Sequence, residues 1–383
     1  MSPKSIKIYL HAHVPVCRMK TQAFILLAFL LCTLEACNTK NNFYCGADLS
    51  YANEMLDCGG TYRAEGQAVN PYELFAQKGC NLVRIRLWHT PKQNAYSGFE
   101  DVKRAITQAK LNKMSVLLDF HYSDTWADPQ KQQIPAAWKG ITDLKTLGDS
   151  IYNYTLSTLM KLHAEDLFPE MVQVGNETNI EILQPDSISH KSINWRRNAY
   201  LLNQAIYAVH KAEELSKLNT GIMLHIAQPE NALWWFKLAH VHGVIGFDWI
   251  GLSYYPKWST TKMEDLPKAL DSLKKTYKKQ LMIVETAYPN TLAEADSANN
   301  ILGKDALLPA YPATPEGQLN YLTDLVTICK NADCEGVIYW EPAWISTNCR
   351  TPWGKGSHWD NATFFDAAKN NEALPAFQFL NLK

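Results

Sequence analysis

The amino-acid sequence predicts an α/β protein built as a single (β/α)8 (TIM) barrel. Eight short apolar runs alternate with polar loops and helical stretches, which is the element count of that barrel. The runs are almost continuously apolar, as expected for a parallel sheet covered by helices. An open doubly wound sheet would favour a glycine-rich phosphate loop after its first strand, and Asp48-Leu49-Ser50-Tyr51 stands there instead.

The predicted strands recur roughly every 40 residues, a spacing compatible with barrel units that carry loop insertions. They cover residues 43–48, 82–88, 115–121, 171–177, 221–226, 247–254, 280–285 and 336–340. Helical segments are predicted at residues 71–79, 99–112, 141–163, 193–215, 262–279 and 314–331. In the second of these, Val102, Ile106 and Ala109 recur at helical spacing and predict one apolar face.

Residues 1–37 are predicted to be an export leader rather than part of the fold. An apolar run over residues 23–31 follows Arg18 and Lys20, and it is too short to be a stable membrane anchor. The leader ends in Leu34-Glu35-Ala36-Cys37, which resembles a bacterial lipoprotein box. We therefore expect an exported protein, lipid-anchored through Cys37 at the bacterial cell surface or outer membrane. An ordinary secretory signal with an incidental cysteine is the alternative.

Composition adds limits on partners and on domain number. Residues 38–42 are predicted to be a short tether and residues 43–381 one barrel domain, because no linker or low-complexity tract follows the tether. The 383 residues are 46% hydrophobic and 20% charged, with a formal net charge of −1. This balance offers no electrostatic basis for binding nucleic acid. A monomer is the default expectation.

The cysteines predict no zinc site. Of nine in the chain, six follow the leader, and none form a CxxC pair: Cys45, Cys58, Cys80, Cys329, Cys334 and Cys349. Export permits disulfides, but buried free thiols fit the spacing equally well.

Two predicted strands end on a glutamate. Glu177 closes Val174-Gly175-Asn176-Glu177 on the fourth strand, and Glu285 closes the seventh. A buried strand does not need a carboxylate at its tip, because an unpaired buried charge is costly. Strands four and seven face each other across an eight-stranded barrel. The pair therefore predicts a two-carboxylate site, the arrangement typical of glycoside hydrolysis.

Other polar or aromatic residues stand near the same strand ends, where barrel enzymes carry their active sites. They are Asp48, Arg84, Arg86, Trp88, Asp119, His121, Asn176, His225, Tyr254 and Trp340. Packing alone does not readily explain so many at one mouth, so we expect these residues, apart from Arg84, to bind the substrate. The 12 tryptophans fit either a Trp-rich core or a cleft that stacks on sugars. His121 and His225 lack metal-binding spacing, so we expect no metal ligands.

Ordered motifs along residues 43–381 carry a family resemblance. They are Gly46-Ala47-Asp48, Val83-Arg84-Ile85-Arg86-Leu87-Trp88, Asp119-Phe120-His121-Tyr122-Ser123-Asp124-Thr125-Trp126-Ala127-Asp128-Pro129, Val174-Gly175-Asn176-Glu177, Ser253-Tyr254-Tyr255-Pro256 and Val284-Glu285-Thr286. This set resembles the endo-β-1,4-galactanases of glycoside hydrolase family 53, within the clan of retaining (β/α)8 glycosidases. The segment from Asp119 to Pro129 is the most specific motif.

The resemblance implies a single catalytic domain acting on the β-1,4-galactan side chains of pectin (arabinogalactan I). It implies that Glu177 is the general acid/base and Glu285 the nucleophile. Asn176 would hydrogen-bond the sugar 2-hydroxyl at the cleavage point.

The surrounding residues are expected to support the two glutamates or to bind the sugar. Arg86, or else Arg84, is expected to hold Glu285 as an anion, because a nearby cation lowers a carboxylate pKa. Tyr254 is expected to hydrogen-bond Glu285. Trp88 and Trp340 are candidate sugar platforms.

Two alternatives and one cofactor question accompany this interpretation. Another β-glycanase of the clan, such as a β-mannanase or endoglucanase, is one alternative. A non-catalytic surface glycan-binding protein is the other, although both glutamates are intact. The resemblance implies no cofactor for catalysis.

Structural calcium is a separate question. Some family members bind calcium after the seventh strand, but residues 294–300 offer too few evident ligands, so we do not expect structural calcium here.

Overall fold

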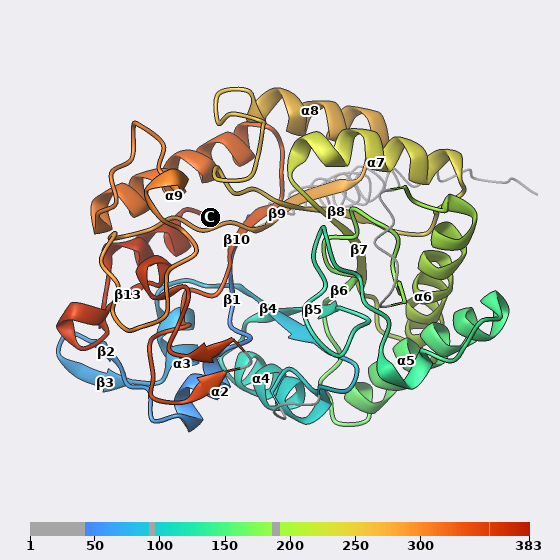
Figure 1. Cartoon of the computed structure of the whole chain (residues 1–383), viewed down its shortest axis with the longest axis horizontal. Coiled ribbons are helices and arrows are strands. Elements are labelled where there is room, and N and C mark those ends of the chain that lie inside the picture. The colour runs from blue at the N-terminus through green and yellow to red at the C-terminus, as the bar shows by residue number, and fades with distance from the viewer. Residues whose placement is uncertain (1–42, 92–95, 186–191, 352) are drawn as a thin grey trace, which may run out of the picture. The chain divides into compact units, whose positions relative to one another are not determined.

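The computed structural model describes residues 43–91, 96–185, 192–351 and 353–383. Phe43–Lys383 forms one compact unit, and the predicted leader, tether and Cys37 lie outside the described residues. Eight parallel strands close a barrel in the order β1-β10-β9-β8-β7-β6-β5-β4, and β1 pairs with both β4 and β10. Helices surround these strands, with α7 and α8 along the upper side of Figure 1. The predicted (β/α)8 barrel is confirmed.

All eight predicted strands are barrel strands. They are β1 (Tyr44–Asp48), β4 (Leu82–Leu87), β5 (Ser115–Phe120), β6 (Met171–Val174), β7 (Gly221–Ala227), β8 (Trp249–Ser253), β9 (Gln280–Glu285) and β10 (Gly336–Tyr339). The largest difference is at β6, which ends at Val174 rather than at residue 177. Gly175 has φ +83° and Glu177 has φ 44°, so the extended backbone stops before the glutamate.

Eight α-helices lie in the described part of the chain. They are α2 (Ala52–Asp57), α3 (Pro71–Gln77), α4 (Phe99–Leu111), α5 (Leu144–His163), α6 (Trp195–Ser216), α7 (Pro229–Val241), α8 (Leu266–Tyr277) and α9 (Pro315–Asn331). The longer ones begin at side-chain caps: Asp143 accepts from the Thr146 amide at α5, and Thr314 accepts from the Gly317 amide at α9.

Short elements complete the architecture outside the barrel. A four-stranded sheet consists of β2 (Tyr62–Ala64), β3 (Gln67–Val69), β13 (Phe365–Asp366) and β14 (Glu372–Ala373), and a hairpin joins β11 (Arg350–Thr351) and β12 (Gly354–Lys355). The 3-10 turns are Ala136–Trp138, Lys304–Ala306, Asp360–Ala362, Ala367–Lys369 and Pro375–Asn381.

Helices α2 and α7 were not predicted. The sequence of α7 lacks a clean polar face, because Leu233, Trp234 and Val241 are exposed while Trp235 and Phe236 on the same helix are buried. Apolar residues on all sides weaken the periodic signal from which an amphipathic helix is recognised.

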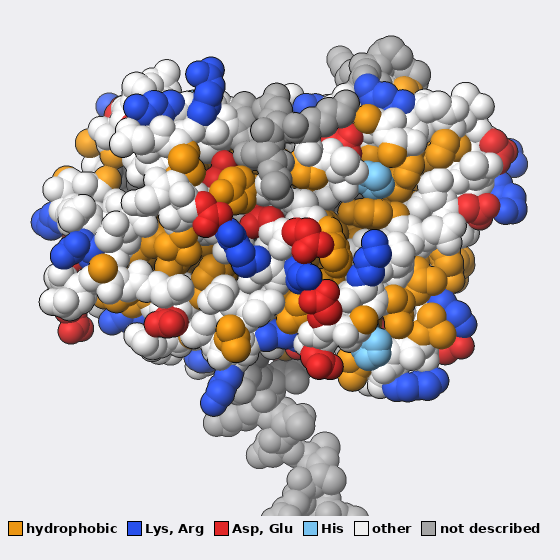
Figure 2. Space-filling view, turned by 90° about the horizontal axis from the view of Figure 1, so that it is seen from below, with side chains coloured by type: hydrophobic (Ala, Val, Ile, Leu, Met, Phe, Trp, Pro, Cys, Tyr) orange, Lys and Arg blue, Asp and Glu red, His pale blue; other side chains and the backbone are white. Residues whose placement is uncertain are grey.

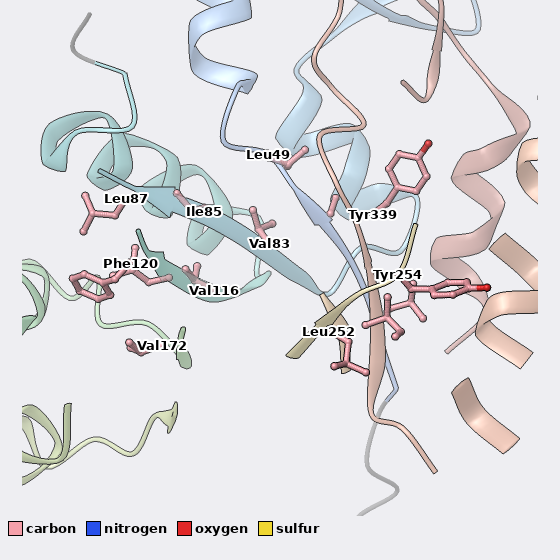
Figure 3. Close-up of a cluster of buried hydrophobic side chains, with 14 of the residues drawn as sticks. Leu49, Val83, Ile85, Leu87, Val116, Phe120, Val172, Leu252, Tyr254 and Tyr339 are labelled. Carbon is pink, nitrogen blue, oxygen red and sulfur yellow. The ribbon is translucent and has the colours of Figure 1, made fainter. Parts of the chain in front are cut away.

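The barrel has two apolar layers. A small cluster fills its interior with side chains from successive strands, including Leu82, Leu117 and Met223. A larger cluster lies between the strands and the helices, and Figure 3 shows part of it, with Val83, Ile85 and other strand residues directed outward. Alternation along each strand therefore sends even-numbered β4 residues, including Arg84 and Arg86, to the interior.

The face drawn in Figure 2 intersperses basic and acidic side chains without a continuous patch of one sign. Among the described residues, no helix is long and apolar enough to cross a bilayer.

One disulfide joins Cys58, after α2, to Cys349, before β11, across a sequence separation of 291 residues. Cys45, Cys80, Cys329 and Cys334 are buried free thiols. The structure thus contains both alternatives that the cysteine spacing left open.

Removing this disulfide should destabilise the fold. We expect the double variant Cys58→Ser/Cys349→Ser to lose about 2–4 kcal/mol of unfolding free energy, because the unfolded chain gains conformational freedom when a long loop is released. Urea unfolding measures the change, and the wild type in reductant is the matched control. Equal stability of the oxidised wild type and the double variant would contradict the prediction.

Candidate active site

The two glutamates meet at the barrel mouth. One carboxylate oxygen of Glu177, one of Glu285 and one ring nitrogen of His225 all lie within 4.8 Å of one another. Retaining glycosidases hold their two carboxyl groups about 5–5.5 Å apart, whereas inverting ones leave room for water at about 6.5–9.5 Å. The separation therefore fits the retaining arrangement.

A β-bulge aims Glu285 into the mouth. Met282 and Val284 of β9 both belong to the interior cluster, so strict alternation would turn residue 285 outward. The register between β8 and β9 shifts by one residue at Leu252 and Ser253, and Ser253 pairs with Glu285. The extra residue reverses the side-chain direction at the strand tip, a common role of bulges beside functional sites.

Glu285 is held between a cation and a hydroxyl group. Nη1 of Arg84 lies 2.9 Å from its Oε1, and the Tyr255 hydroxyl donates to its Oε2 at 3.1 Å. Burial raises the pKa of Glu285 to about 7, and the guanidinium of Arg84 opposes that rise. Of the two glutamates, Glu285 is the one that ionises first, because Arg84 contacts it directly.

The environment of Glu177 differs, because no cation among the described residues forms an ion pair with it. The Ser253 hydroxyl donates to its Oε1 at 2.6 Å. Burial and the negative charge of Glu285 raise the pKa of Glu177 well above its usual range. One carboxyl group ionised and the other protonated is the state that acid-assisted displacement requires.

His225 lies beneath Glu177 as a neutral imidazole. The Glu177 amide lies 3.3 Å and Gln173 Nε2 3.1 Å from its Nδ1, and both are donors. Asn176 Oδ1 lies 3.0 Å from the same nitrogen but already accepts from Arg84 and Gln173, so Nδ1 is assigned as an acceptor. Its Nε2 therefore carries the proton and faces the Ser253 oxygen at 2.9 Å. Burial, with the charge of Arg84, lowers the pKa of His225 well below its usual value. The imidazole thus orients Ser253 as a donor to Glu177.

Arg84 connects the barrel floor to both glutamate strands. It lies 2.8 Å from carboxylate oxygens of Asp48 and Asp119, and its Nη2 donates to Asn176 Oδ1 at 2.6 Å. Asn176 in turn donates to the Ala127 carbonyl at 2.8 Å. Arg84, Asp48, Asp119 and Asn176 are each at most 3% exposed. Their hydrogen-bond network is therefore rigid and largely inaccessible to water.

Both glutamates open into a cleft of about 1230 Å³, called the main cleft below. Six of the 12 tryptophans line it: Trp126, Trp258, Trp340, Trp344, Trp353 and Trp359. Aromatic walls around a few polar groups are typical of small-molecule and sugar sites. The tryptophans therefore serve the cleft as much as the core.

Comparison with known proteins decides the family. The model of glycosyl hydrolase family 53 matches residues 44–380. The chain belongs to glycosyl hydrolase family 53. It is 56% identical to an arabinogalactan endo-beta-1,4-galactanase of Cellvibrio japonicus over 93% of this chain and 94% of that protein. It is 32% identical to an endo-beta-1,4-galactanase of Bacillus subtilis, over 81% of this chain and 72% of that protein.

Solved structures agree with this family 53 assignment. The catalytic domain of an Ignisphaera aggregans family 53 protein superposes with a TM-score of 0.81 at 30% identity, covering 90% of this chain and 97% of that one. Fungal beta-1,4-galactanases superpose at 0.76 with 29% identity, covering 88% and 98%. An endo-1,4-beta-xylanase of Caldicellulosiruptor owensensis shares only the fold, with a TM-score of 0.56 at 15% identity.

In this family 53 chain, eight of the predicted site residues fall into two groups. Glu177, Glu285, Asn176 and Trp340 line the main cleft. Asp48, Asp119, His121 and His225 lie beneath it as buried supports, with His121 Nε2 3.0 Å from Asp119. That the four residues of this second group bind the substrate directly stays a prediction.

The expected bond from Tyr254 to Glu285 is wrong. The Tyr254 hydroxyl donates to the Thr261 carbonyl at 3.3 Å, and its ring belongs to the larger apolar cluster between strands and helices, part of which Figure 3 shows. Tyr255 makes the bond instead. The reason is parity: Trp249 and Ser253 face the interior, so residue 255 follows them and residue 254 does not.

The two arginines also separate. Arg84, not Arg86, pairs with Glu285, whereas Arg86 pairs with Glu341 at 2.9 Å. Trp88 does not line the main cleft as a platform, because it is 4% exposed and packs on the Arg86 guanidinium. Both residues therefore lie behind the cleft wall.

Glu341 and Ser253 are two residues of the site that were not predicted from the sequence. Glu341 follows β10, is fully buried and accepts from the Tyr51 amide at 3.1 Å. A third strand-tip glutamate was visible in the sequence and could have been found by the same reasoning as the first two. Ser253 stands in the motif Ser253-Tyr254-Tyr255-Pro256, but a serine is common in both strands and loops, so nothing marked its side chain as a partner of Glu177.

Metal chemistry has weak support at this site. Among the described residues, the one group of three potential ligands is Glu177, His225 and Glu285. Arg84 and Tyr255 already occupy the Glu285 oxygens, and Ser253 occupies Glu177 Oε1. These partners match an acid/base pair better than a metal centre.

The bond from Ser253 should control the alkaline limit of activity. It stabilises the charged form of Glu177, so Ser253→Ala should raise the pKa of Glu177 further. The acid then stays protonated to higher pH, and the alkaline limb of the kcat/KM profile should move upward. Initial rates on galactan across pH measure this shift.

Ser259→Ala is the control, because Ser259 bonds Glu230 and not the glutamate pair. If the alkaline limb of Ser253→Ala stays in place or moves to lower pH, the bond from Ser253 does not control the pKa of Glu177.

Proposed function

We propose that this chain is an endo-acting, retaining arabinogalactan endo-β-1,4-galactanase. The observation that carries the proposal is the Glu177–Glu285 pair, whose oxygens lie within 4.8 Å of each other in a family 53 barrel. The 56% identical relative named for the same activity supports the choice of substrate.

In the first step, Glu285 attacks the anomeric carbon of the galactosyl residue at the cleavage point. The bond to the leaving-group oxygen breaks, and Glu177 gives that oxygen its proton. In the second step, Glu177 takes a proton from water, whose oxygen displaces Glu285 and restores both carboxyl groups. Asn176, which lines the main cleft, would bind the sugar 2-hydroxyl, a contact that strengthens in the transition state.

Release of reducing ends from linear β-1,4-galactan, β-mannan and cellulose tests the substrate. We expect hydrolysis of galactan above the other two by a wide margin. Preference for mannan or cellulose would indicate another β-glycanase of the clan. Binding of galactan without hydrolysis would indicate a surface glycan-binding protein.

We also propose export and attachment through Cys37, because residues 1–37 combine a basic start, an apolar run and a lipobox-like end. Detergent phase partition of the full chain tests it: Cys37→Ser should move the protein from the detergent phase to the aqueous phase. Protease treatment of intact cells then reports whether the anchored protein faces outward. A monomer is expected by size-exclusion chromatography.

No structural calcium is expected. The carboxylates after β9 already have protein donors: Asp296 accepts from Ser346 at 2.6 Å and Glu294 from Asn300 at 2.7 Å. A chelator should therefore leave the melting temperature and activity unchanged. A fall in melting temperature that calcium restores would contradict this prediction.

A further inference from the structure

A second hollow of about 500 Å³ adjoins the main cleft. Pro129 and Asn231 line both spaces, so the second hollow, called the side hollow below, shares its walls with the cleft that holds the glutamates. Its other walls come from the segment after β6 and from α7. Nothing in the two-glutamate chemistry uses this space.

One wall of the side hollow is formed by an exposed tryptophan, Trp234. It is 42% exposed although it is a tryptophan on a helix, whereas its neighbour Trp235 is buried. Its Nε1 donates to Asn231 Oδ1 at 3.4 Å, and Asn231 donates to the Ala227 carbonyl at 2.9 Å. The indole is thus oriented by a residue of the cleft wall. An exposed aromatic face beside amide groups suits the apolar face of a pyranose ring.

The barrel order gives the direction of the substrate chain. Trp340, Trp344 and Trp353 follow β10, and β10 stands four places from β6 in the ring of eight. The side hollow lies with the segments after β6 and β7. A polysaccharide that contacts both walls must therefore cross the mouth over the two glutamates.

The role of Glu177 decides which half of the substrate reaches the side hollow. Asn179 and Ile180, which follow Glu177 in the chain, line it. Glu177 protonates the leaving-group oxygen, so the sugars that depart first extend toward its own segment. We propose that the side hollow is a distal subsite for a leaving-group galactosyl residue, stacked on Trp234. This inference rests on the proposed galactanase function.

The test compares long and short substrates. Trp234→Ala should lower kcat/KM on linear β-1,4-galactan roughly three- to tenfold, the loss expected for one aromatic contact. Short galactooligosaccharides that fill only the positions beside the scissile bond should be cleaved at the wild-type rate. Trp234→Phe should restore part of the rate on the polymer. Chromatography of reducing-end-labelled oligosaccharides should also show that Trp234→Ala shifts the cleavage position.

Leu233→Ala is the matched control, because Leu233 is 38% exposed on the same helix and does not line the side hollow. An unchanged rate ratio between long and short substrates in Trp234→Ala would overturn the subsite. An equal loss on both lengths would also overturn it, because it would indicate a structural role. A wild-type protein that does not cleave galactan would instead refute the proposed function, and the subsite with it.

Discussion

Replacing Glu285 by glutamine should abolish hydrolysis of galactan while leaving the fold intact. We expect a loss on the order of 10⁵-fold in kcat, because the amide cannot form the glycosyl-enzyme bond. The variant should be at least as stable as the wild type. Arg84 faces three carboxylates, those of Asp48, Asp119 and Glu285, so removing one negative charge relieves repulsion among the others.

Reducing-end assays and a melting curve on the same preparation measure both parts of this prediction. Activity near the wild-type level would rule out Glu285 as the nucleophile. A large fall in melting temperature would leave misfolding as the cause of inactivity, and Glu285→Asp then separates geometry from charge.

Comparing Glu177→Gln with Glu285→Gln distinguishes the acid/base from the nucleophile. On galactan, Glu177→Gln should lose about 10²- to 10⁴-fold, because the leaving alcohol is no longer protonated. A dinitrophenyl galactoside has a leaving group that needs no proton, so this variant should still release a burst of dinitrophenol and accumulate the glycosyl-enzyme. Glu285→Gln should give no burst. Opposite results would exchange the two roles.

Replacing Arg84 by methionine should have the largest effect on stability. The side chain is 1% exposed and lies 2.8 Å from Asp48 and from Asp119, both of which are fully buried. Its removal leaves buried carboxylates without a cation, which costs about 3–5 kcal/mol of unfolding free energy. Loss of activity should accompany it, because Glu285 loses the charge that favours its ionised form.

Arg104→Met is the matched control. Arg104 makes an equally short 2.7 Å contact with Asp57, but both side chains are more than 40% exposed. Such a surface pair is worth at most about 1 kcal/mol. Denaturant unfolding of the two variants should therefore differ by several fold in free-energy loss. Equal losses would mean that burial does not govern the Arg84 network.

Several features of the site could be predicted because they depend on local pattern. Apolar runs of strand length bounded by polar loops identify all eight barrel strands. A glutamate at the end of such a run is conspicuous, which singles out Glu177 and Glu285. Parity along one strand correctly placed Arg84 and Arg86 on the same face.

Other predictions were wrong or incomplete because they depended on the position of a second strand. Whether Arg84 or Arg86 reaches Glu285 depends on the depth of each strand in the barrel, and single-strand parity does not contain that depth. The choice between Tyr254 and Tyr255 required the end of β8 to be placed to within one residue, which is the least certain part of any sequence-based prediction. The β-bulge that turns Glu285 inward exists only as a pairing between β8 and β9.

By itself, the sequence determined the barrel, its order of elements and the two strand-tip glutamates, because hydrophobic periodicity and a misplaced charge are both local signals. Only the tertiary structure decided what surrounds those glutamates. Ser253 and Tyr255 come from the end of β8 and Arg84 comes from β4, whereas the six cleft tryptophans come from the segments that follow β5, β8 and β10. Closing the barrel brings these side chains within hydrogen-bonding distance, and that proximity sets the pKa values and the shape of the cleft.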